Sequence, residues 1–252
     1  MSEINPKLIY VEKQARHNYL THKLLYKYNQ AEIREIDSQK DIVELYKNPD
    51  AIKNWMQIKR DTLILANLKG ISARPNCRST DFIAPSHSSG CFSGCLYCYV
   101  PRRKGTANPI TIFTNFDKIL NYLRGHDERN GPKQVTSENY QTDPKYRTYD
   151  IGENNDCSFD AKITDSVKKL VHLFRDEMKW GKASFSTKFV NYEMLEYEPN
   201  RKTRIRFALM PENISKTVDI RTSSINERIK AIEPFFKAGY EVHINFSPII
   251  IY

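Results

Sequence analysis

The sequence lacks the segments that send a chain into or across a membrane. No stretch of about eighteen consecutive apolar residues occurs, the length that a helix needs to span a bilayer. The first residues, MSEINPKLIYVEKQ, do not combine a basic start with an apolar stretch, so they do not resemble a signal peptide. We therefore expect no membrane association and a cytoplasmic location, where thiols remain reduced.

Cysteine is also scarce, and its arrangement excludes a disulfide framework. The chain has five cysteines, an odd number, and Cys91, Cys95 and Cys98 fall within eight residues. Disulfide-rich domains instead carry an even number of cysteines, spread along the chain. Clustered thiols in a reducing compartment favour metal binding.

Acidic residues are in the minority. The chain carries 39 Lys and Arg against 30 Asp and Glu, a formal net charge of +9. Such a surface favours polyanions, nucleic acid above all, although a basic protein without a polyanionic partner remains an alternative. Three adjacent cations, Arg102, Arg103 and Lys104, form a turn just after the cysteines. They could hold phosphates or form a solvated loop.

The first 75 residues are predicted to form a small α/β unit. Apolar or alternating stretches at residues 8–11, 31–37 and 62–68 predict strands, and residues 15–29 have helical spacing, as does a polar segment ending near residue 60. Strand–helix–strand order favours parallel strands joined by right-handed crossovers. This unit carries no catalytic motif, and we expect it to form an N-terminal domain over residues 1–75.

Residues 76–252 continue as an alternating series. Strands are predicted at residues 82–85, 110–114, 149–153, 183–189, 203–209 and 241–247, and helices at 116–123, 164–178 and 223–238. The polar stretch 125–147 is expected to be an excursion from the main fold. A parallel, strand-first series closes best as a full or partial (β/α) barrel, whose working face is the carboxyl end of its strands. The predicted fold class is therefore α/β.

The three clustered cysteines have the spacing C-x3-C-x2-C, with Gly90 and Gly94 beside them. Thiolates suit iron–sulfur clusters and zinc. Three thiolates on a [4Fe–4S] cluster leave one iron open, which can chelate a small molecule. Zinc remains an alternative, since Cys77, Cys157 or His87 could supply a fourth ligand, although structural zinc usually takes two C-x2-C-like pairs.

The loop Ser89-Gly90-Cys91-Phe92-Ser93-Gly94-Cys95-Leu96-Tyr97-Cys98-Tyr99 resembles that of the spore photoproduct lyase family of radical S-adenosylmethionine (AdoMet) enzymes. Similar segments lie in the same order along most of the chain: Ile33-Arg34-Glu35-Ile36-Asp37-Ser38, Ser186-Thr187-Lys188-Phe189, Lys202-Thr203-Arg204-Ile205-Arg206-Phe207, Asn226-Glu227-Arg228-Ile229, Ala238-Gly239-Tyr240 and Phe246-Ser247-Pro248-Ile249-Ile250-Ile251-Tyr252. The cysteine motif alone indicates only the superfamily, whereas the later segments make the resemblance specific to one family.

The resemblance implies a [4Fe–4S] cluster and S-adenosylmethionine as cofactors. The reduced cluster would cleave the sulfonium to a 5′-deoxyadenosyl radical, which would abstract a hydrogen atom from a thymine dimer in DNA and so trigger its reversal. The implied partners are DNA with a pyrimidine lesion and an electron donor such as a flavodoxin or ferredoxin. The implied fold is a partial barrel of radical AdoMet type over residues 76–252.

The resemblance also assigns roles to residues. Cys91, Cys95 and Cys98 correspond to the cluster ligands and Lys188 to a lysine that contacts AdoMet. Tyr97 and Tyr99 correspond to tyrosines that assist radical return. The strand end at Glu153 and Asn155 is expected to bind the cofactor.

The sequence departs from the family pattern in three places. Glu153 occupies the position of a cysteine that gives a hydrogen atom to the product radical, and Cys157, four residues on, is the candidate to replace it. Ala208 stands where the family has a serine that contacts the cofactor. The family's C-terminal lesion-binding region would follow Tyr252, so we expect a truncated chain or a segment supplied from elsewhere. A related enzyme with another substrate, or an inactive truncated homologue, is the alternative function.

Overall fold

The computed structural model describes residues 4–46, 48–76, 79–101, 105, 107–134 and 143–250. Some sequence predictions fall outside these ranges: those for Cys77, for the cations at residues 102–104, for part of the 125–147 excursion and for the last two residues. Within the described ranges, no helix is long and apolar enough to cross a membrane.

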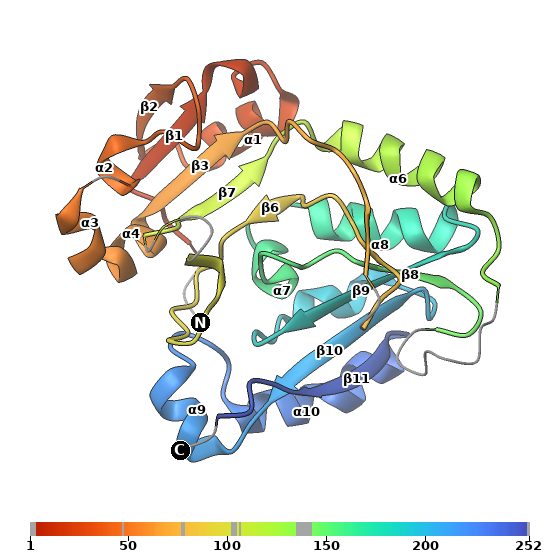
Figure 1. The fold of residues 1–252 in the computed structure, drawn as a ribbon. Coiled ribbons are helices and arrows are strands. Elements are labelled where there is room, and N and C mark those ends of the chain that lie inside the picture. The colour runs from red at the N-terminus through yellow and green to blue at the C-terminus, as the bar shows by residue number, and fades with distance from the viewer. Residues whose placement is uncertain are drawn as a thin grey trace.

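The chain alternates strands and helices from its first described residues (Figure 1). The strands are β1 (Leu8–Glu12), β2 (Glu32–Ile36), β3 (Thr62–Ala66), β4 (Arg74–Pro75), β5 (Phe82–Ile83), β6 (Ser88–Ser89), β7 (Ile110–Phe113), β8 (Arg147–Asp150), β9 (Gly181–Thr187), β10 (Thr203–Leu209) and β11 (Glu241–Phe246). The helices are η1 (Lys13–Ala15), α1 (Tyr19–Lys27), α2 (Val43–Tyr46), α3 (Pro49–Lys53), α4 (Trp55–Asp61), α6 (Phe116–Asn130), α7 (Cys157–Asp160), α8 (Ser166–Asp176), η2 (Tyr192–Tyr197), α9 (Glu212–Val218) and α10 (Ile225–Lys237).

The first sheet has the strand order β2-β1-β3-β7-β6 among the described residues. β1 lies parallel to β2 and β3, which confirms the predicted strand–helix–strand crossovers. The prediction that residues 110–114 belong to the barrel series is wrong, because β7 pairs with β3, with Leu63 opposite Ile110. A short apolar run fits any buried parallel strand, so its pattern does not specify the sheet. The first sheet thus takes strands from both sides of residue 75.

The second sheet has the order β11-β10-β9-β8-β5-β4 in the described part of the chain. β5, β8, β9, β10 and β11 run parallel, and β4 joins the edge in the antiparallel direction. This open, curved series confirms the predicted partial (β/α) barrel, with α8 and α10 packed against it (Figure 1).

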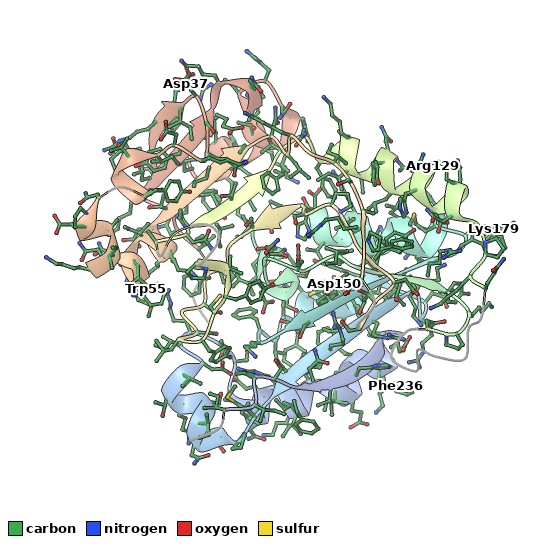
Figure 2. The ribbon with its side chains drawn as sticks, viewed as in Figure 1. Asp37, Trp55, Arg129, Asp150, Lys179 and Phe236 are labelled. Carbon is green, nitrogen blue, oxygen red and sulfur yellow. The ribbon has the colours of Figure 1, made fainter. Side chains whose placement is uncertain are left out.

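The two faces of the barrel strands differ in polarity because side chains alternate along a strand. Phe207 of β10 points to the helix layer, where its ring meets Phe235 of α10 edge-to-face with centroids 5.4 Å apart. Its neighbour Arg206 points to the other face and donates from Nη2 to Asp150 Oδ2 of β8 at 3.0 Å. Asp150 lies near the centre of the molecule (Figure 2). The concave face of the barrel is therefore polar.

The helix predicted at residues 116–123 continues as α6 to Asn130, so the first residues of the expected excursion are helical. The pattern fails there because the buried position that continues Phe116, Ile119 and Leu123 is a carboxylate. Asp127 is only 2% exposed, and its Oδ2 accepts the backbone N–H of Trp180 at 3.0 Å. A hydrogen-bonded polar group takes the place of an apolar one.

A buried ion pair joins α10 to the segment after α9. Arg228 Nη2 lies 3.0 Å from Asp219 Oδ2, and both side chains are completely buried. Arg228 also donates to the carbonyl oxygens of Ser223 and Ala208. The helix itself begins with a reciprocal capping box between Ser224 and Glu227, close to the predicted helix start at residue 223. Residues 219–223 are therefore fixed from two sides.

We predict that Arg228→Met lowers the free energy of unfolding by about 3–5 kcal/mol, because it leaves Asp219 as a buried, uncompensated charge. Urea unfolding followed by circular dichroism measures the change. Lys237→Met, in the same helix, removes an exposed i,i+4 pair with Glu233 and should leave the midpoint within error. Equal midpoints for the two variants would contradict the prediction.

Candidate active site

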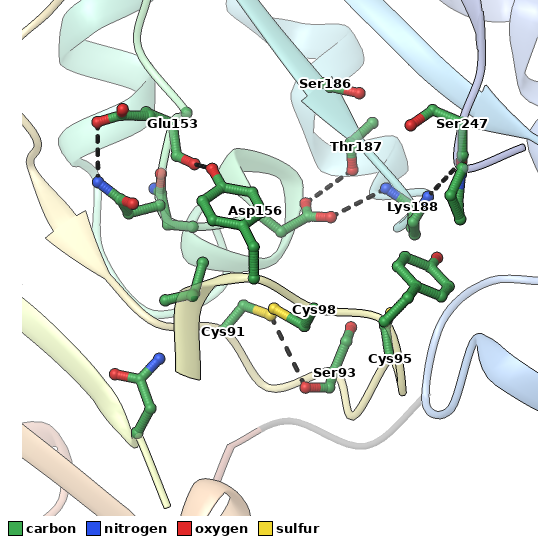
Figure 3. A pocket seen from close by; sticks show the side chains of 18 of the residues that line it. Cys91, Ser93, Cys95, Cys98, Glu153, Asp156, Ser186, Thr187, Lys188 and Ser247 are labelled. Atoms are coloured by element: carbon green, nitrogen blue, oxygen red, sulfur yellow. Dashed lines mark hydrogen bonds between the residues drawn. The ribbon is translucent and has the colours of Figure 1, made fainter. Parts of the chain in front are cut away.

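A cavity of about 460 Å³ opens at the carboxyl ends of the barrel strands, where the fold class predicts a site. The cysteine loop forms one side of the cavity, and the segments that follow β8, β9 and β11 form the other (Figure 3). The structure brings together eight of the nine predicted site residues: Cys91, Cys95, Tyr97, Cys98, Tyr99, Glu153, Asn155 and Lys188.

The cysteine loop is held by backbone hydrogen bonds to distant segments. Gly90 N–H donates to Asn154 O at 2.8 Å, Gly94 N–H to Ile220 O at 2.9 Å and Leu96 N–H to Val218 O at 3.0 Å. Gly90 has φ of +81°, and a Cβ there would lie 2.7 Å from the carbonyl oxygen of Pro109. Only glycine fits this turn without strain.

The other face of the loop packs against α4, the helix that directly precedes β3 of the first sheet. A Cβ on Gly94 would lie 2.5 Å from Met56 Sδ, so the helix and the loop approach closely. Arg221 fastens this contact, since its Nη1 donates to Met56 O at 3.1 Å and its guanidinium lies 4.5 Å from the ring centroid of Phe92. The loop is thus enclosed between the two sheets.

The three thiols of the loop are half-buried. Burial raises the pKa of Cys91, and nearby Cys98 raises it further. Burial and the charge of Cys91 raise the pKa of Cys95 to about 12. Binding of a metal centre by these cysteines would release the thiol protons, because the thiolate is the ligand.

The donor set suits a cluster rather than one ion. Among the described residues, no three His, Cys, Asp or Glu side chains surround a single point, as one metal ion requires. A [4Fe–4S] cluster makes a different demand, because each thiolate binds its own iron corner. Three separate thiols along one wall of a cavity meet that demand.

Lys188 projects into the cavity from the end of β9, opposite the cysteines (Figure 3). Its Nζ donates to Ser247 O at 3.0 Å and lies 5.5 Å from the centroid of the Tyr97 ring. Burial lowers the pKa of Lys188, whereas the negative charge of Asp219 opposes this shift. These contacts of the Lys188 ammonium are both to neutral groups, which leaves it able to bind an anion.

Asp156 fixes the strand end that carries Lys188. Its carboxylate accepts the backbone N–H of Lys188 at 2.9 Å and the hydroxyl of Thr187 at 2.7 Å. It also caps α7 by accepting the backbone N–H groups of Ser158 and Phe159. Burial raises the pKa of Asp156, and the hydrogen bonds from Lys188 and Thr187 oppose the shift. The Asp156 carboxylate is therefore engaged mainly by backbone N–H groups and is not free to bind a ligand by itself.

Glu153 and Asn155 line the cavity but are already engaged. Glu153 Oε2 accepts from Arg74 Nη2 at 2.5 Å and from Asn154 Nδ2 at 2.9 Å, and its carbonyl accepts the hydroxyl of Tyr99. Asn155 Nδ2 lies 3.1 Å from His87 Nε2 and also bonds Asp160. The binding of a cofactor amino group by Glu153 thus stays a prediction. It requires the Glu153 carboxylate to bind that amino group and Arg74 at the same time.

Cys157 is the one predicted site residue that the structure does not place in the cavity. It begins α7 and is completely buried, and its Sγ donates to Ile151 O at 3.6 Å. Burial raises the pKa of this thiol well above its ordinary value. The predicted role as hydrogen donor would need α7 to move.

Sequence reasoning missed several cavity residues. Lys59 comes from α4, in a unit without a catalytic motif, and a lysine in a polar helical segment gives no signal. Asp150 and Arg206 form an ion pair in the cavity wall. The alternation of β10 places Arg204 and Arg206 on one face, but nothing in the sequence indicates which acidic residues pair with them.

Comparison with known proteins agrees with the geometry. The sequence model of a protein family described as "Spore photoproduct lyase" matches residues 4–252. The spore photoproduct lyase of Bacillus subtilis is 26% identical over 98% of this chain and 68% of its own length. That of a Geobacillus species is 26% identical over 99% of this chain and 69% of its own.

Solved structures establish the fold. Spore photoproduct lyase complexed with dinucleoside spore photoproduct matches the whole of this chain and 70% of its own with a TM-score of 0.85, at 22% identity. A doubly substituted variant with bound AdoMet and the same dinucleoside matches with a TM-score of 0.84, at 22% identity. The family model spans nearly every residue, and the predicted fold and resemblance are both confirmed. The chain therefore belongs to the spore photoproduct lyase family.

Proposed function

We propose that this protein is a radical S-adenosylmethionine enzyme that reverses the spore photoproduct, a thymine dimer in DNA, as a carbon–carbon lyase. The observation that carries the proposal is the shared cavity, into which one loop brings three thiols and the end of β9 brings Lys188. Relatives at 26% identity bear the name of that activity, and a structure with this fold holds AdoMet and the dinucleoside lesion.

Cys91, Cys95 and Cys98 would hold a [4Fe–4S] cluster through three thiolates. When bound and reduced, the cluster with AdoMet supplies a 5′-deoxyadenosyl radical. The protein itself would enclose the cluster and the cofactor. The loop is clamped between α4 and residues 218–220, and the strand ends close the other side. Such enclosure keeps water from a reactive intermediate.

Lys188 would bind the carboxylate of AdoMet. Its ammonium faces the cysteine side of the cavity, and Asp156 holds the backbone beneath it. Glu153 and Asn155, on the neighbouring segment, would bind the amino group and ribose side of the cofactor. A lysine opposite a cluster is well placed to pair with a carboxylate at the open iron.

Tyr97 and Tyr99 would return a hydrogen atom at the end of the reaction. Tyr97 donates its hydroxyl to Asp219, and burial raises its pKa well above the ordinary value, a shift to which this hydrogen bond adds. Tyr99 donates to the carbonyl of Glu153. The phenol of Tyr97 therefore stays protonated at neutral pH, which a hydrogen atom donor requires.

The proposed partners follow from the substrate. The net charge of +9 suits a DNA backbone, and the lesion must leave the base stack to reach an enclosed cavity. A flavodoxin or ferredoxin would supply one electron at a time, and the enzyme would work in the cytoplasm. The first 75 residues would act as a domain that supports the cluster loop.

Glu153 favours a second candidate, a related radical AdoMet enzyme with another substrate. It stands where the family pattern has a hydrogen-donating cysteine, and Arg74 holds it at the cavity wall. Among the described residues that line the cavity, the thiols are the three proposed cluster ligands. The hydrogen atom that quenches the product radical would then come from a group other than a thiol at the end of β8.

The cluster assignment predicts about four irons and four sulfides per chain after anaerobic reconstitution. Replacing Cys91, Cys95 or Cys98 with Ala should abolish stable loading, as measured by iron and sulfide analysis. Cys157→Ala is the matched control and should load normally, because Cys157 lies outside the cavity. Stoichiometric zinc in place of iron would contradict the assignment.

Lys188→Met should weaken AdoMet binding to the cluster-loaded protein by about tenfold or more, since a hydrogen bond to a charged group contributes about 1.5–3 kcal/mol. Anaerobic calorimetry with matched iron content measures the change. Lys216→Met, an exposed lysine of α9, should bind AdoMet like the parent protein. Unchanged affinity in Lys188→Met would remove Lys188 from the cofactor site.

Repair itself is tested with the reconstituted protein, dithionite, AdoMet and dinucleoside spore photoproduct. We expect the lesion to be converted to its two thymines, and Cys95→Ala to abolish this conversion. Formation of 5′-deoxyadenosine without loss of the lesion would overturn the repair assignment and favour the second candidate.

A further inference from the structure

One lysine of the N-terminal unit is buried beside the cysteine loop. Lys59 lies in the last turn of α4, is only 1% exposed and lines the same cavity as the three cysteines. Its Nζ lies 5.8 Å from the ring centroid of Trp55, which precedes it by one turn. Because α4 packs on Gly94 through Met56, this lysine is held against the loop rather than free to swing into solvent.

The ammonium of Lys59 has no anionic partner among the residues that the structure describes, although burial of an unpaired charge is costly. The chain treats another buried lysine differently. Lys182 is 5% exposed and lies 2.7 Å from Asp143, with Glu241 as a second carboxylate partner. The contrast indicates that Lys59 faces an anion that is not a side chain of the described protein.

The position of Lys59 indicates which anion it faces. Lys59 lines the cavity together with Cys91, Cys95 and Cys98, whose thiolates would hold the cluster. Two other cations near the thiols donate hydrogen bonds to backbone carbonyl oxygens. Arg221 donates to Met56 O and lies over Phe92, and Lys188 donates to Ser247 O on the far side of the cavity.

We propose that Lys59 is the counter-ion of the iron–sulfur cluster held by Cys91, Cys95 and Cys98, and that it stabilises the cluster's reduced state. This inference rests on the proposed cluster. A [4Fe–4S]²⁺ core with three thiolates has a net negative charge, and one electron from an external flavodoxin or ferredoxin makes it more negative. A fixed cation at short range in a protein interior favours the more negative form and raises the reduction potential.

The test is a redox titration of the reconstituted protein, followed by electron paramagnetic resonance and carried out without AdoMet. Lys59→Met should make the reduction equilibrium at least about tenfold less favourable, a negative shift of at least 59 mV for one electron. Lys59→Arg keeps the charge and should restore most of the potential. Lys202→Met is the control, because this partly buried lysine lies before β10, outside the cavity, and donates to Met178 O.

The outcomes separate this inference from the proposed function. If the parent protein assembles no iron–sulfur cluster, both fail. If Lys59→Met assembles the cluster with an unchanged potential, the inference is overturned and the proposed function stands. If the shift occurs only with AdoMet bound, Lys59 is a cofactor contact and the inference is again overturned. Loss of loading in folded Lys59→Met, with loading kept in Lys59→Arg, supports the counter-ion role.

Discussion

The cysteine loop depends on a buried ion pair that is not part of it. Arg228 and Asp219 are both fully buried, and together they fix residues 219–223 between α9 and α10. The segment around this pair provides the carbonyl acceptors for the N–H groups of Gly94 and Leu96. Asp219 also accepts the hydroxyl of Tyr97. The cysteine loop has little regular structure of its own. Its shape therefore depends on Asp219, which cannot move without leaving Arg228 as a buried, unpaired charge.

The N-terminal unit completes the same site from the opposite side. The first sheet continues through β7 and β6, and β6 leads directly into the loop at Gly90. α4 then covers the loop with Met56 and Lys59. The cysteine loop consequently lies at the junction of two sheets, and neither sheet alone encloses it (Figure 1). This junction explains why a unit without a catalytic motif contributes to the cavity.

Local patterns in the sequence predict those features of the structure that depend on interactions between residues close together in the chain. The alternation in residues 203–209 places β10 and its two faces, and the serines at residues 223 and 224 locate the start of α10. The C-x3-C-x2-C spacing predicts three of the cavity residues without any knowledge of the fold. Each of these features depends on residues within about two turns of one another.

What the sequence does not predict depends on partners far along the chain. Ile110–Phe113 is a strand by its pattern, but only its pairing with β3 assigns it to the first sheet. Glu153 follows a strand as predicted, yet Arg74, which engages it, lies 79 positions earlier. Cys157 is four residues from Glu153, but α7 turns it into the core. Short separation in sequence does not bring two side chains into one cavity.

The charges around the cavity would let one site accept both a cluster and a cofactor that carries a carboxylate. Its carboxylates are each engaged: Glu153 with Arg74, Asp150 with Arg206, and Asp156 with backbone N–H groups and Thr187. Lys59 and Lys188, on opposite sides, contact only neutral groups among the described residues. Lys59 and Lys188 are therefore the cations of the cavity that remain available to a bound anion. A negatively charged cluster beside Lys59 and a carboxylate beside Lys188 would pair with these two cations. Lys59 could then stay buried, and Lys188 half-buried, without a protein carboxylate.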